Sequence, residues 1–210
     1  MSTTKTQSNL YTIMEERKSV RVYDPAFKIP QVELEAIIQE ATSAPSSSNL
    51  QPWRFLVIQD EAVKTELRAI ANNQEQVETS SAIIAVLGNA EMYKQVEQIY
   101  TQNVAEGHMG EAQKDLMITN TLRTYPAAPL EVRKNIATFD AGLISMQLML
   151  IAKEKGYDTV TMGGFDKEKF AKRFELPEHI FPVVLIAIGK AAAPAYGSSR
   201  LPLKDIARFI

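Results

Sequence analysis

Apolar positions along this chain follow two patterns. Where apolar residues recur three or four positions apart, the spacing predicts amphipathic helices, and short continuous apolar runs predict buried strands. The helical pattern covers residues 9–17, 30–43, 60–72, 129–156 and 166–176. The strand pattern covers residues 53–60, 81–89, 157–162 and 181–191. Pro30 falls at the first turn of its helix, Asp60 is a candidate N-cap, and Gly156 is expected to end the long helix.

The order of these elements bears on domain organisation. Residues 91–124 are polar and helical in composition, with the weakest core signal, and no internal repeat is evident. The serine-rich segment APSSSN, residues 44–49, is too short for a linker and leads directly into a strand. Strands and helices therefore alternate along one continuous chain, which predicts a single α/β-type domain over residues 1–210.

Composition narrows the function classes. Hydrophobic residues make up 45% of the 210 and charged residues 23%, as in soluble globular proteins. The net charge is −2 and no basic run occurs, so we expect no nucleic-acid partner. The apolar segments 141–152 and 181–189 are too short to cross a bilayer, and the polar N-terminus does not resemble a signal peptide. With no cysteine, the chain is expected in the cytoplasm, without a membrane partner.

Several familiar catalytic motifs are missing from the sequence. It contains no G-x-G-x-x-G after a strand, no Walker loop and no G-x-S-x-G elbow. His108 and His179 are far apart and outside metal-ligand spacing, so we interpret both as ordinary surface or edge histidines and expect no metal. If the protein is an enzyme, its side chains do not carry the difficult chemistry, which points to a cofactor.

Two segments could bind an anion. In ERKSVRVYDP, residues 16–25, an extended backbone would project Arg17, Ser19 and Arg21 to one side. Two guanidinium groups with a hydroxyl between them suit a phosphate and its polyol. Arg200 lies beside two serines in GSSRLP and suits a phosphate as well. The alternatives are a solvated basic turn after a helix and a plain surface loop.

Two further segments could approach a flat ligand. Gly163 and Gly164 in TMGGFD would let the backbone come close and present an N–H group. The carboxamides of Asn73 and Gln76, one helical turn apart, suit a ring edge that alternates donors and acceptors. The alternatives are a plain tight turn and a polar helix end.

The stretch APSSSNLQPW presents hydroxyls and amides between two prolines. Pro45 and Pro52 stiffen its ends, so its polar groups would be held at fixed spacing. The alternative is a surface loop in which Trp53 simply anchors the core. None of these segments is decisive by itself.

In this order the segments resemble the FMN-dependent nitroreductase family. RKSVR followed by APSSSNLQPWRF is similar to that family's N-terminal signature, and NQEQVE, GGFD and SSRLPL fall where the family holds its flavin. The resemblance runs from about residue 10 to the tail. It implies an α+β fold, with a central, mostly antiparallel sheet flanked by helices. It also implies an intertwined homodimer whose C-terminal tail wraps the partner.

The resemblance further implies residue roles. Arg17 and Arg200 would hold the FMN phosphate, Ser19 the ribityl or phosphate oxygens, and Arg21 the pyrimidine side near N1 and the C2 carbonyl. Segment 45–49 would contact the flavin of the second subunit. The complete implied set of cofactor-binding residues is Arg17, Lys18, Ser19, Arg21, Pro45, Ser46, Ser47, Asn49, Asn73, Gln76, Met162, Gly163, Gly164 and Arg200.

The remaining implied contacts concern the flavin ring. Asn73 and Gln76 would read its N3 and O2 edge, Gly163 would offer its backbone N–H to N5, and Gly164 would pack beside the ring. Many relatives have a lysine where Gln76 stands and an acidic residue where Gly163 stands. These departures leave the flavin potential and the pocket shape open.

By the same resemblance, NADH or NADPH would reduce the flavin and leave, and a nitroaromatic or quinone would then enter the same pocket. No side chain would act as an acid or base. Two alternatives stay open: a flavin-binding storage or sensor protein with little turnover, and a specialised member that dehalogenates a substrate or fragments flavin. Segment 91–124 is the candidate lid for such a specialised member.

The long apolar helix around residues 132–155 could serve either a dimer interface or the core of one subunit. Small residues there would permit close helix approach, while larger apolar residues would supply contact area. The small residues are Ala141, Gly142 and Ser145, and the larger ones are Leu143, Met146, Met149 and Leu150.

Overall fold

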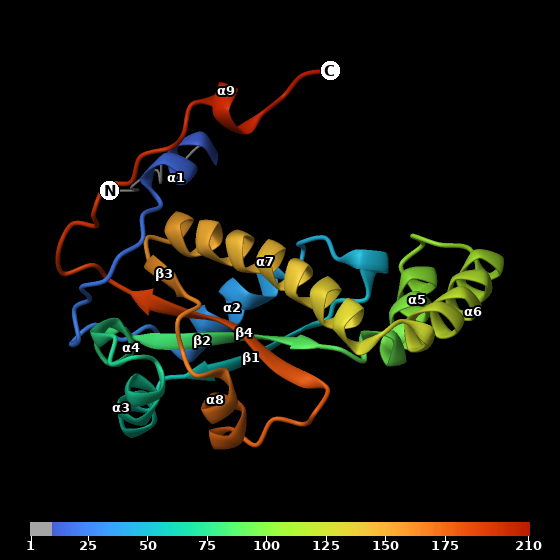
Figure 1. Cartoon of the computed structure of the whole chain (residues 1–210), viewed down its shortest axis with the longest axis horizontal. Helices are drawn as coiled ribbons and strands as arrows, with labels where there is room; N and C mark the ends of the chain where they lie inside the picture. The colour runs from blue at the N-terminus through green and yellow to red at the C-terminus, as the bar shows by residue number, and fades with distance from the viewer. Residues whose placement is uncertain (1–9) are drawn as a thin grey trace, which may run out of the picture.

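The computed structural model describes residues 10–210 of the chain, and Figure 1 shows its elements. Its four strands are β1 (Trp53–Ile58), β2 (Ala82–Asn89), β3 (Asp158–Met162) and β4 (Ile180–Gly189). Its α-helices are α1 (Leu10–Glu16), α2 (Gln31–Ala41), α3 (Glu61–Ile70), α4 (Glu75–Thr79), α5 (Val96–Ala105), α6 (Glu111–Ala127), α7 (Leu130–Glu154), α8 (Lys167–Arg173) and α9 (Leu203–Ile206). Two short 3₁₀ turns are η1 (Ser47–Asn49) and η2 (Met92–Gln95).

The four strands form one sheet in the order β1-β2-β4-β3, and every pairing between them is antiparallel. A sheet of this kind, flanked by separate helices, is an α+β fold. The fold class expected from the family resemblance is therefore confirmed. All the strands and helices expected from the hydrophobic pattern are present, and residues 91–124 are mostly helical as expected.

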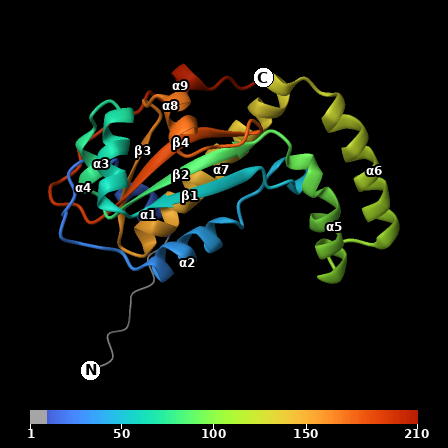
Figure 2. The same ribbon diagram turned by 90° about the horizontal axis from the view of Figure 1, so that it is seen from below.

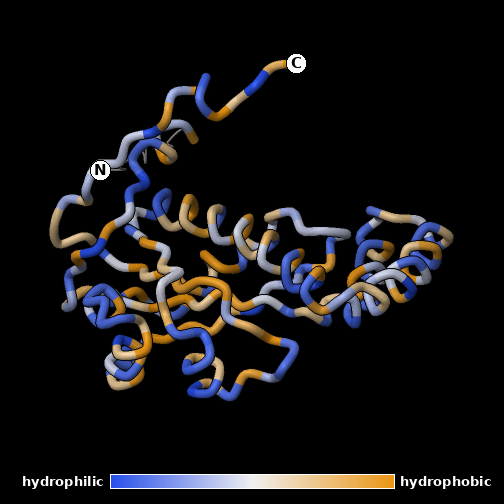
Figure 3. Tube along the Cα trace, in the orientation of Figure 1, coloured by the Kyte–Doolittle hydropathy of each residue, from blue (hydrophilic) through white to orange (hydrophobic). Residues whose placement is uncertain are grey.

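Helices cover both faces of the sheet, and side chains of the two central strands alternate between them. α2 and α7 pack on the face that holds Ala82, Ile84 and Val86 of β2. α3, α4 and α8 pack on the face that holds Ile83 and Ala85. Figure 3 shows the hydrophobic colour concentrated in these strands. Because both faces of β2 are buried, its sequence is a continuous apolar run rather than an alternating one.

Local end signals work as expected at two helices. The Asp60 side chain accepts a hydrogen bond from the backbone N–H of Val63 at 3.0 Å, capping α3. Gly156 follows α7 with φ +81°, a left-handed conformation that glycine adopts without strain.

By length and composition alone, the long helix α7 could cross a membrane. The sequence analysis judged only its segment 141–152, which is shorter than the whole helix. In the structure it packs instead on α2 and the sheet. Ala137, Asp140, Ile144 and Leu148 are among its buried residues. α7 is therefore a core helix.

The face that α7 leaves open differs from the one expected. Ala141, Ser145 and Met149 are buried within their own subunit, so they are core residues and offer no close approach to a second helix. Gly142 and Met146 do lie on the open face. Val132 and Phe139 are exposed on α7 as well. The expectation assigned helix positions by residue size, whereas burial depends on which side of the helix meets the sheet.

Helices α5 and α6 form an arm at one end of the molecule, opposite the end that holds α3 and α4 (Figures 1 and 2). A third apolar cluster joins the arm to the body through Leu50, Val96, Tyr100 and Ala137. The arm thus packs directly beside the segment that precedes β1.

Candidate functional site

The segment after α1 lies along the edge strand β3. Ser19 forms a parallel bridge with Thr159, and the N–H of Val20 donates to the carbonyl of Thr159 at 3.1 Å. Arg17 and Ser19 are half-buried, whereas Lys18 and Arg21 are exposed. The basic segment is therefore extended and fixed against the sheet rather than a solvated turn.

Arg17 has an unusual environment in this segment. Its Nε is buried and has no hydrogen-bond partner within residues 10–210, and no acidic side chain in that range pairs with it. A buried guanidinium donor without a partner is costly, by about 1–3 kcal/mol. An anion at this position would remove that cost.

The turn between α3 and α4 contacts the glycine turn that follows β3. The side-chain amides of Asn72 and Gln74 both donate to the carbonyl of Gly164, at 2.9 and 3.1 Å. Asn73, between them, is exposed with φ +55°. The sequence analysis missed Asn72 and Gln74, although both belong to the same amide-rich run as Asn73.

The sequence analysis expected Asn73 and Gln76 one turn apart on a helix, but the structure does not place them so. α4 begins at Glu75, so Asn73 stands outside it in a left-handed turn. Gln76 is buried in α4, and its Nε2 donates to Oε1 of Gln74 at 3.0 Å. The left-handed turn redirects the chain, and helical spacing therefore does not relate the two carboxamides.

A buried lysine fixes the end of α4. The ammonium of Lys64 donates to the carbonyls of Glu78 and Ser80 at 3.0 and 2.6 Å, and Glu61 lies 3.2 Å from it. Burial lowers the pKa of Lys64, and Glu61 opposes that shift. These contacts hold α4, and with it Gln76, against α3.

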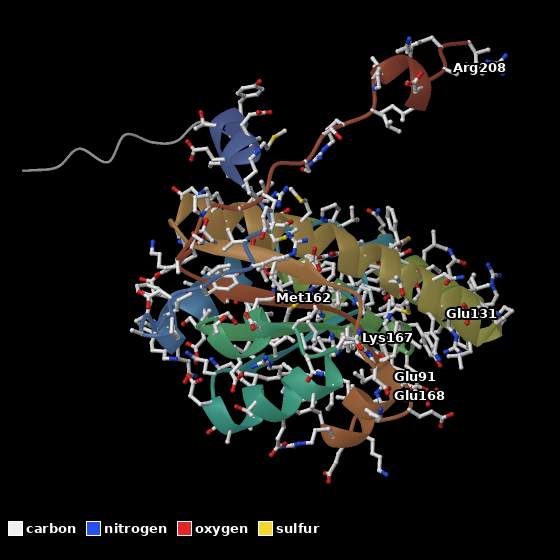
Figure 4. The ribbon with its side chains drawn as sticks, turned by 60° about the vertical axis from the view of Figure 1, so that its left-hand side comes forward. Glu91, Glu131, Met162, Lys167, Glu168 and Arg208 are labelled. Carbon is white, nitrogen blue, oxygen red and sulfur yellow. The ribbon has the colours of Figure 1, made fainter. Side chains whose placement is uncertain are left out.

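The end of β3 completes this region. Met162 is buried, and Figure 4 shows it within the body of the protein. Gly163 and Gly164 follow and are exposed. A Cβ added at Gly163 would meet nothing within 4 Å, so the backbone there faces open space. We call this group, formed by segment 17–21, the turn 72–76 and residues 162–164, the sheet-end half-site.

Segment 45–49 lies elsewhere and is shaped, not a loose linker. Its Ser47 binds the carboxylate of Asp140 on α7: the backbone N–H donates to Oδ2 and the hydroxyl to Oδ1, both at 3.0 Å. The Tyr100 hydroxyl donates to the carbonyl of Ser48 at 2.9 Å, and the Tyr125 hydroxyl to Ser48 Oγ at 3.2 Å. We call this segment with its three anchoring side chains the loop half-site.

Pro45 and Asn49 of this segment are exposed, and Ser46 and Ser47 are half-buried. Trp53 is buried in the core that contains α2 and α7, so it anchors the end of the loop. The sequence analysis missed Asp140, Tyr100 and Tyr125. Asp140 alone had a visible signal, as a single carboxylate inside an otherwise apolar stretch.

Burial raises the pKa of the Asp140 carboxyl, and its two hydrogen bonds from Ser47 oppose the shift. An acid whose pKa is higher in the folded state binds its proton more tightly there than in the unfolded chain. Its contribution to stability is therefore greatest below the unfolded value of about 3.9 and declines as pH rises through the raised pKa.

As pH rises from about 4 to about 7, we expect the free energy of unfolding of Asp140→Asn to increase relative to that of the natural protein. The asparagine carries no charge, and its amide can still accept from the Ser47 N–H and donate to the Ser47 hydroxyl. Urea unfolding at several pH values, followed by circular dichroism, measures this. A difference that does not change with pH would contradict it.

Arg200 lies apart from both half-sites in the exposed tail. Its guanidinium bonds only locally among the described residues, to Ser198 and Ser199. The tail leaves the body of the protein, and Arg208 stands far out from it (Figure 4). Among residues 10–210, no hydrogen bond or ion pair joins the sheet-end half-site to the loop half-site.

The two histidines are surface residues, as interpreted from the sequence. His108 lies 3.4 Å from Glu106 and His179 lies 3.8 Å from Glu91. Within residues 10–210, no three His, Asp or Glu side chains are grouped closely enough to hold a metal.

Comparison with known proteins identifies the family of this chain. A model of the nitroreductase family matches residues 14–190. The chain belongs to the nitroreductase family. Among relatives, the proposed NAD(P)H nitroreductase YdgI of Bacillus subtilis is 46% identical over 199 residues, which cover 94% of this chain and 95% of YdgI. The enone reductase of CLA biosynthesis from Lactiplantibacillus plantarum is 32% identical, over 97% of this chain and 95% of its own.

Two solved nitroreductase-type structures resemble this one over nearly their whole length. A proposed nitroreductase from Exiguobacterium sibiricum, in complex with FMN, is 43% identical with a TM-score of 0.93, covering 99% of this chain and all of that one. A proposed NAD(P)H:FMN oxidoreductase from Staphylococcus epidermidis is 39% identical with a TM-score of 0.94 and full coverage of both chains. The recognition of the family from its sequence segments is thus confirmed.

Proposed function

We propose that this nitroreductase is an FMN-dependent NAD(P)H oxidoreductase that works as a homodimer in the cytoplasm, with residues 1–210 as one FMN-binding domain. The similarity to an FMN complex at 43% identity supports the cofactor, and the name of YdgI supports the electron donor. The lack of cysteine fits a reducing compartment.

The observation that carries the proposal is the environment of Arg17. Its buried Nε lacks a partner within residues 10–210, and Ser19 lies two positions further along an extended segment. FMN carries about −1.5 to −2 charges on its phosphate, with strong acceptor oxygens. A phosphate at Arg17 would give the buried Nε–H an acceptor and pair the charge of the guanidinium.

The other residues of the sheet-end half-site fit the same group. Arg21 would face the pyrimidine edge, with Asn73 and Gln76 reading its N3 and O2 side. Gly163 would offer its backbone N–H to N5, since open space faces it, with Gly164 beside the ring. Lys18 and Met162 flank these contacts, and Arg200 would join Arg17 on the phosphate.

Bound FMN supplies hydride transfer in both directions. The residues of the chain would bind and orient the FMN and adjust the charge around its ring. Arg21 would stabilise negative charge developing at the N1 and C2 oxygen edge. NADH or NADPH and the acceptor would use one pocket in turn, so no dinucleotide fold is needed. We propose nitroaromatics and quinones as acceptors, and the enone reductase relative makes conjugated enones a further class to assay.

A second subunit would bring the two half-sites together. Pro45, Ser46, Ser47 and Asn49 of one chain would contact the flavin held by the sheet-end half-site of the other. The single chain also leaves much apolar surface uncovered, as an obligate dimer does when its subunits are separated. The large exposed apolar residues of α1, α7 and the tail are Leu10, Tyr11, Met14, Leu130, Val132, Phe139, Met146, Leu201, Leu203, Ile206, Phe209 and Ile210.

An absorption spectrum of the purified protein, with and without added FMN, tests the cofactor. We expect oxidised-flavin bands and one FMN per subunit. A protein that stays colourless and takes up no FMN would overturn the proposal.

Steady-state assays with NADH or NADPH test turnover. We expect oxidation of the nucleotide that depends on a nitroaromatic, quinone or enone acceptor, with the parallel double-reciprocal lines of a ping-pong enzyme. Yellow protein without acceptor-dependent oxidation would instead favour a flavin store or sensor.

A further inference from the structure

The backbone of the loop half-site, and of Gln51 just after it, adopts a conformation that the sequence does not favour. Ser48 and Asn49 have φ of +51°, and Gln51 has φ of +46°. Left-handed conformations are unfavourable for most non-glycine residues, and they persist only where surrounding contacts impose them. Three such residues within four positions therefore require anchors outside the segment.

Asp140 supplies the anchor on the α7 side. Both of its carboxylate oxygens are used on a single residue, Ser47, one accepting from the backbone N–H and the other from the hydroxyl. Tyr100 holds the next residue from the arm, through the carbonyl of Ser48. The turn is thus held by hydrogen bonds from two elements, α5 about 50 positions away in the chain and α7 about 90 positions away.

Stability does not explain a carboxylate at this place. Asp140 is fully buried, as are Ala137, Ala141 and Ile144 of the same helix, and no Lys, Arg or His within residues 10–210 pairs with it. Replacing buried charged groups with apolar ones is often neutral or stabilising, so a lone buried carboxylate points to a purpose other than stability. Its two bonds to Ser47 identify that purpose as the placement of the loop.

We propose that Asp140 is a positioning residue, whose carboxylate holds Ser47 so that residues 45–49 keep the geometry needed to contact FMN. This inference rests on the proposed function, in which that loop reaches the flavin of the second subunit. Phe139, the preceding residue of α7, is exposed on the open face of the helix. One turn of α7 therefore sets the loop relative to the surface that would meet the partner.

The first measurement uses the flavin-free protein. Hydrogen exchange of the backbone amides of residues 46–50 reports loop order without any cofactor. In Asp140→Ala we expect the Ser47 amide to exchange at least about tenfold faster than in the natural protein, because its acceptor is gone. In Asp140→Asn, which keeps an acceptor, we expect exchange within about threefold of the natural rate.

The second measurement is FMN binding by fluorescence quenching. We expect Asp140→Ala to raise the Kd by about tenfold to a hundredfold, and Asp140→Asn to restore it to within about threefold. Size-exclusion chromatography with light scattering should show a dimer for both. Ser47→Ala, which loses only the hydroxyl bond, should show a smaller increase and covers the case in which Asp140→Ala does not fold.

Asp60→Ala is the control, since it also removes a carboxylate that accepts a backbone N–H, at the exposed start of α3 and away from the loop. It should lower stability without changing the FMN Kd. Unchanged Ser47 exchange in Asp140→Ala would overturn the inference, as would faster exchange with an unchanged Kd, or an asparagine variant as impaired as the alanine one. If the natural protein binds no FMN, the proposed function and the flavin part of this inference fall, while the exchange rates still decide whether Asp140 holds the loop.

Discussion

Arg17→Ala is expected to raise the Kd for FMN about a hundredfold, because charge-assisted hydrogen bonds to a phosphate contribute about 1.5–3 kcal/mol and each 1.4 kcal/mol is tenfold. Arg17 is half-buried, and the segment that follows it is fixed against β3 through Ser19. Arg200→Ala should have a smaller effect, about tenfold, because Arg200 starts from an exposed tail whose ordering offsets part of its contribution.

The measurement is a titration of flavin-free protein with FMN, followed by fluorescence. Arg173→Ala is the matched control: this arginine pairs with Glu66 on the surface, and losing such a pair has little effect. It should bind FMN as the natural protein does. If Arg17→Ala and Arg200→Ala both keep the natural affinity, the phosphate does not lie where we propose.

Phe139→Glu is expected to convert the dimer into monomers that no longer retain FMN. Phe139 is 64% exposed on the open face of α7 in the single chain, where a partner would cover it. An unpaired charge buried in such an interface costs about 3–5 kcal/mol, which weakens association by at least about a hundredfold. Flavin would be lost along with the partner, since each site would then keep only its sheet-end half.

Light scattering and the absorbance ratio of flavin to protein measure both effects. Val32→Glu is the matched control, because Val32 is 68% exposed on α2 and the same charge there should leave dimer and flavin unchanged. Removing residues 201–210 while keeping Arg200 should also lower dimer stability and flavin content, if the tail wraps the partner. A Phe139→Glu protein that stays dimeric and yellow would show that α7 does not form the interface.

Much of the fold followed from local pattern. The continuous apolar runs of β2 and β4 predicted buried strands, and Gly156 and Asp60 marked helix ends. Each of these signals depends on residues a few positions apart, so it can be read from the sequence alone. The prediction for α7 was only partly right, because residue size does not reveal which side of a helix meets the sheet.

The candidate site was predictable in its pieces but not in its assembly. The sequence identified Arg17, Gly163 and Ser47 as candidate ligands of a flavin. It did not identify Asp140, which lies 93 positions from Ser47, or Asn72, which lies 92 positions from the Gly164 carbonyl that it binds. It also misplaced Asn73 and Gln76 on one helix, because a left-handed turn at Asn73 separates them.

By itself, the sequence determined the strands and helices and the family, because hydrophobic period, end signals and short polar motifs are properties of neighbouring residues. Only the tertiary structure decided which distant segments meet. It placed the basic segment on β3, tied the amide turn to Gly164, and fixed the serine loop to α7, apart from the other half-site. Such pairings arise from the packing of whole elements on the sheet, which no local pattern encodes.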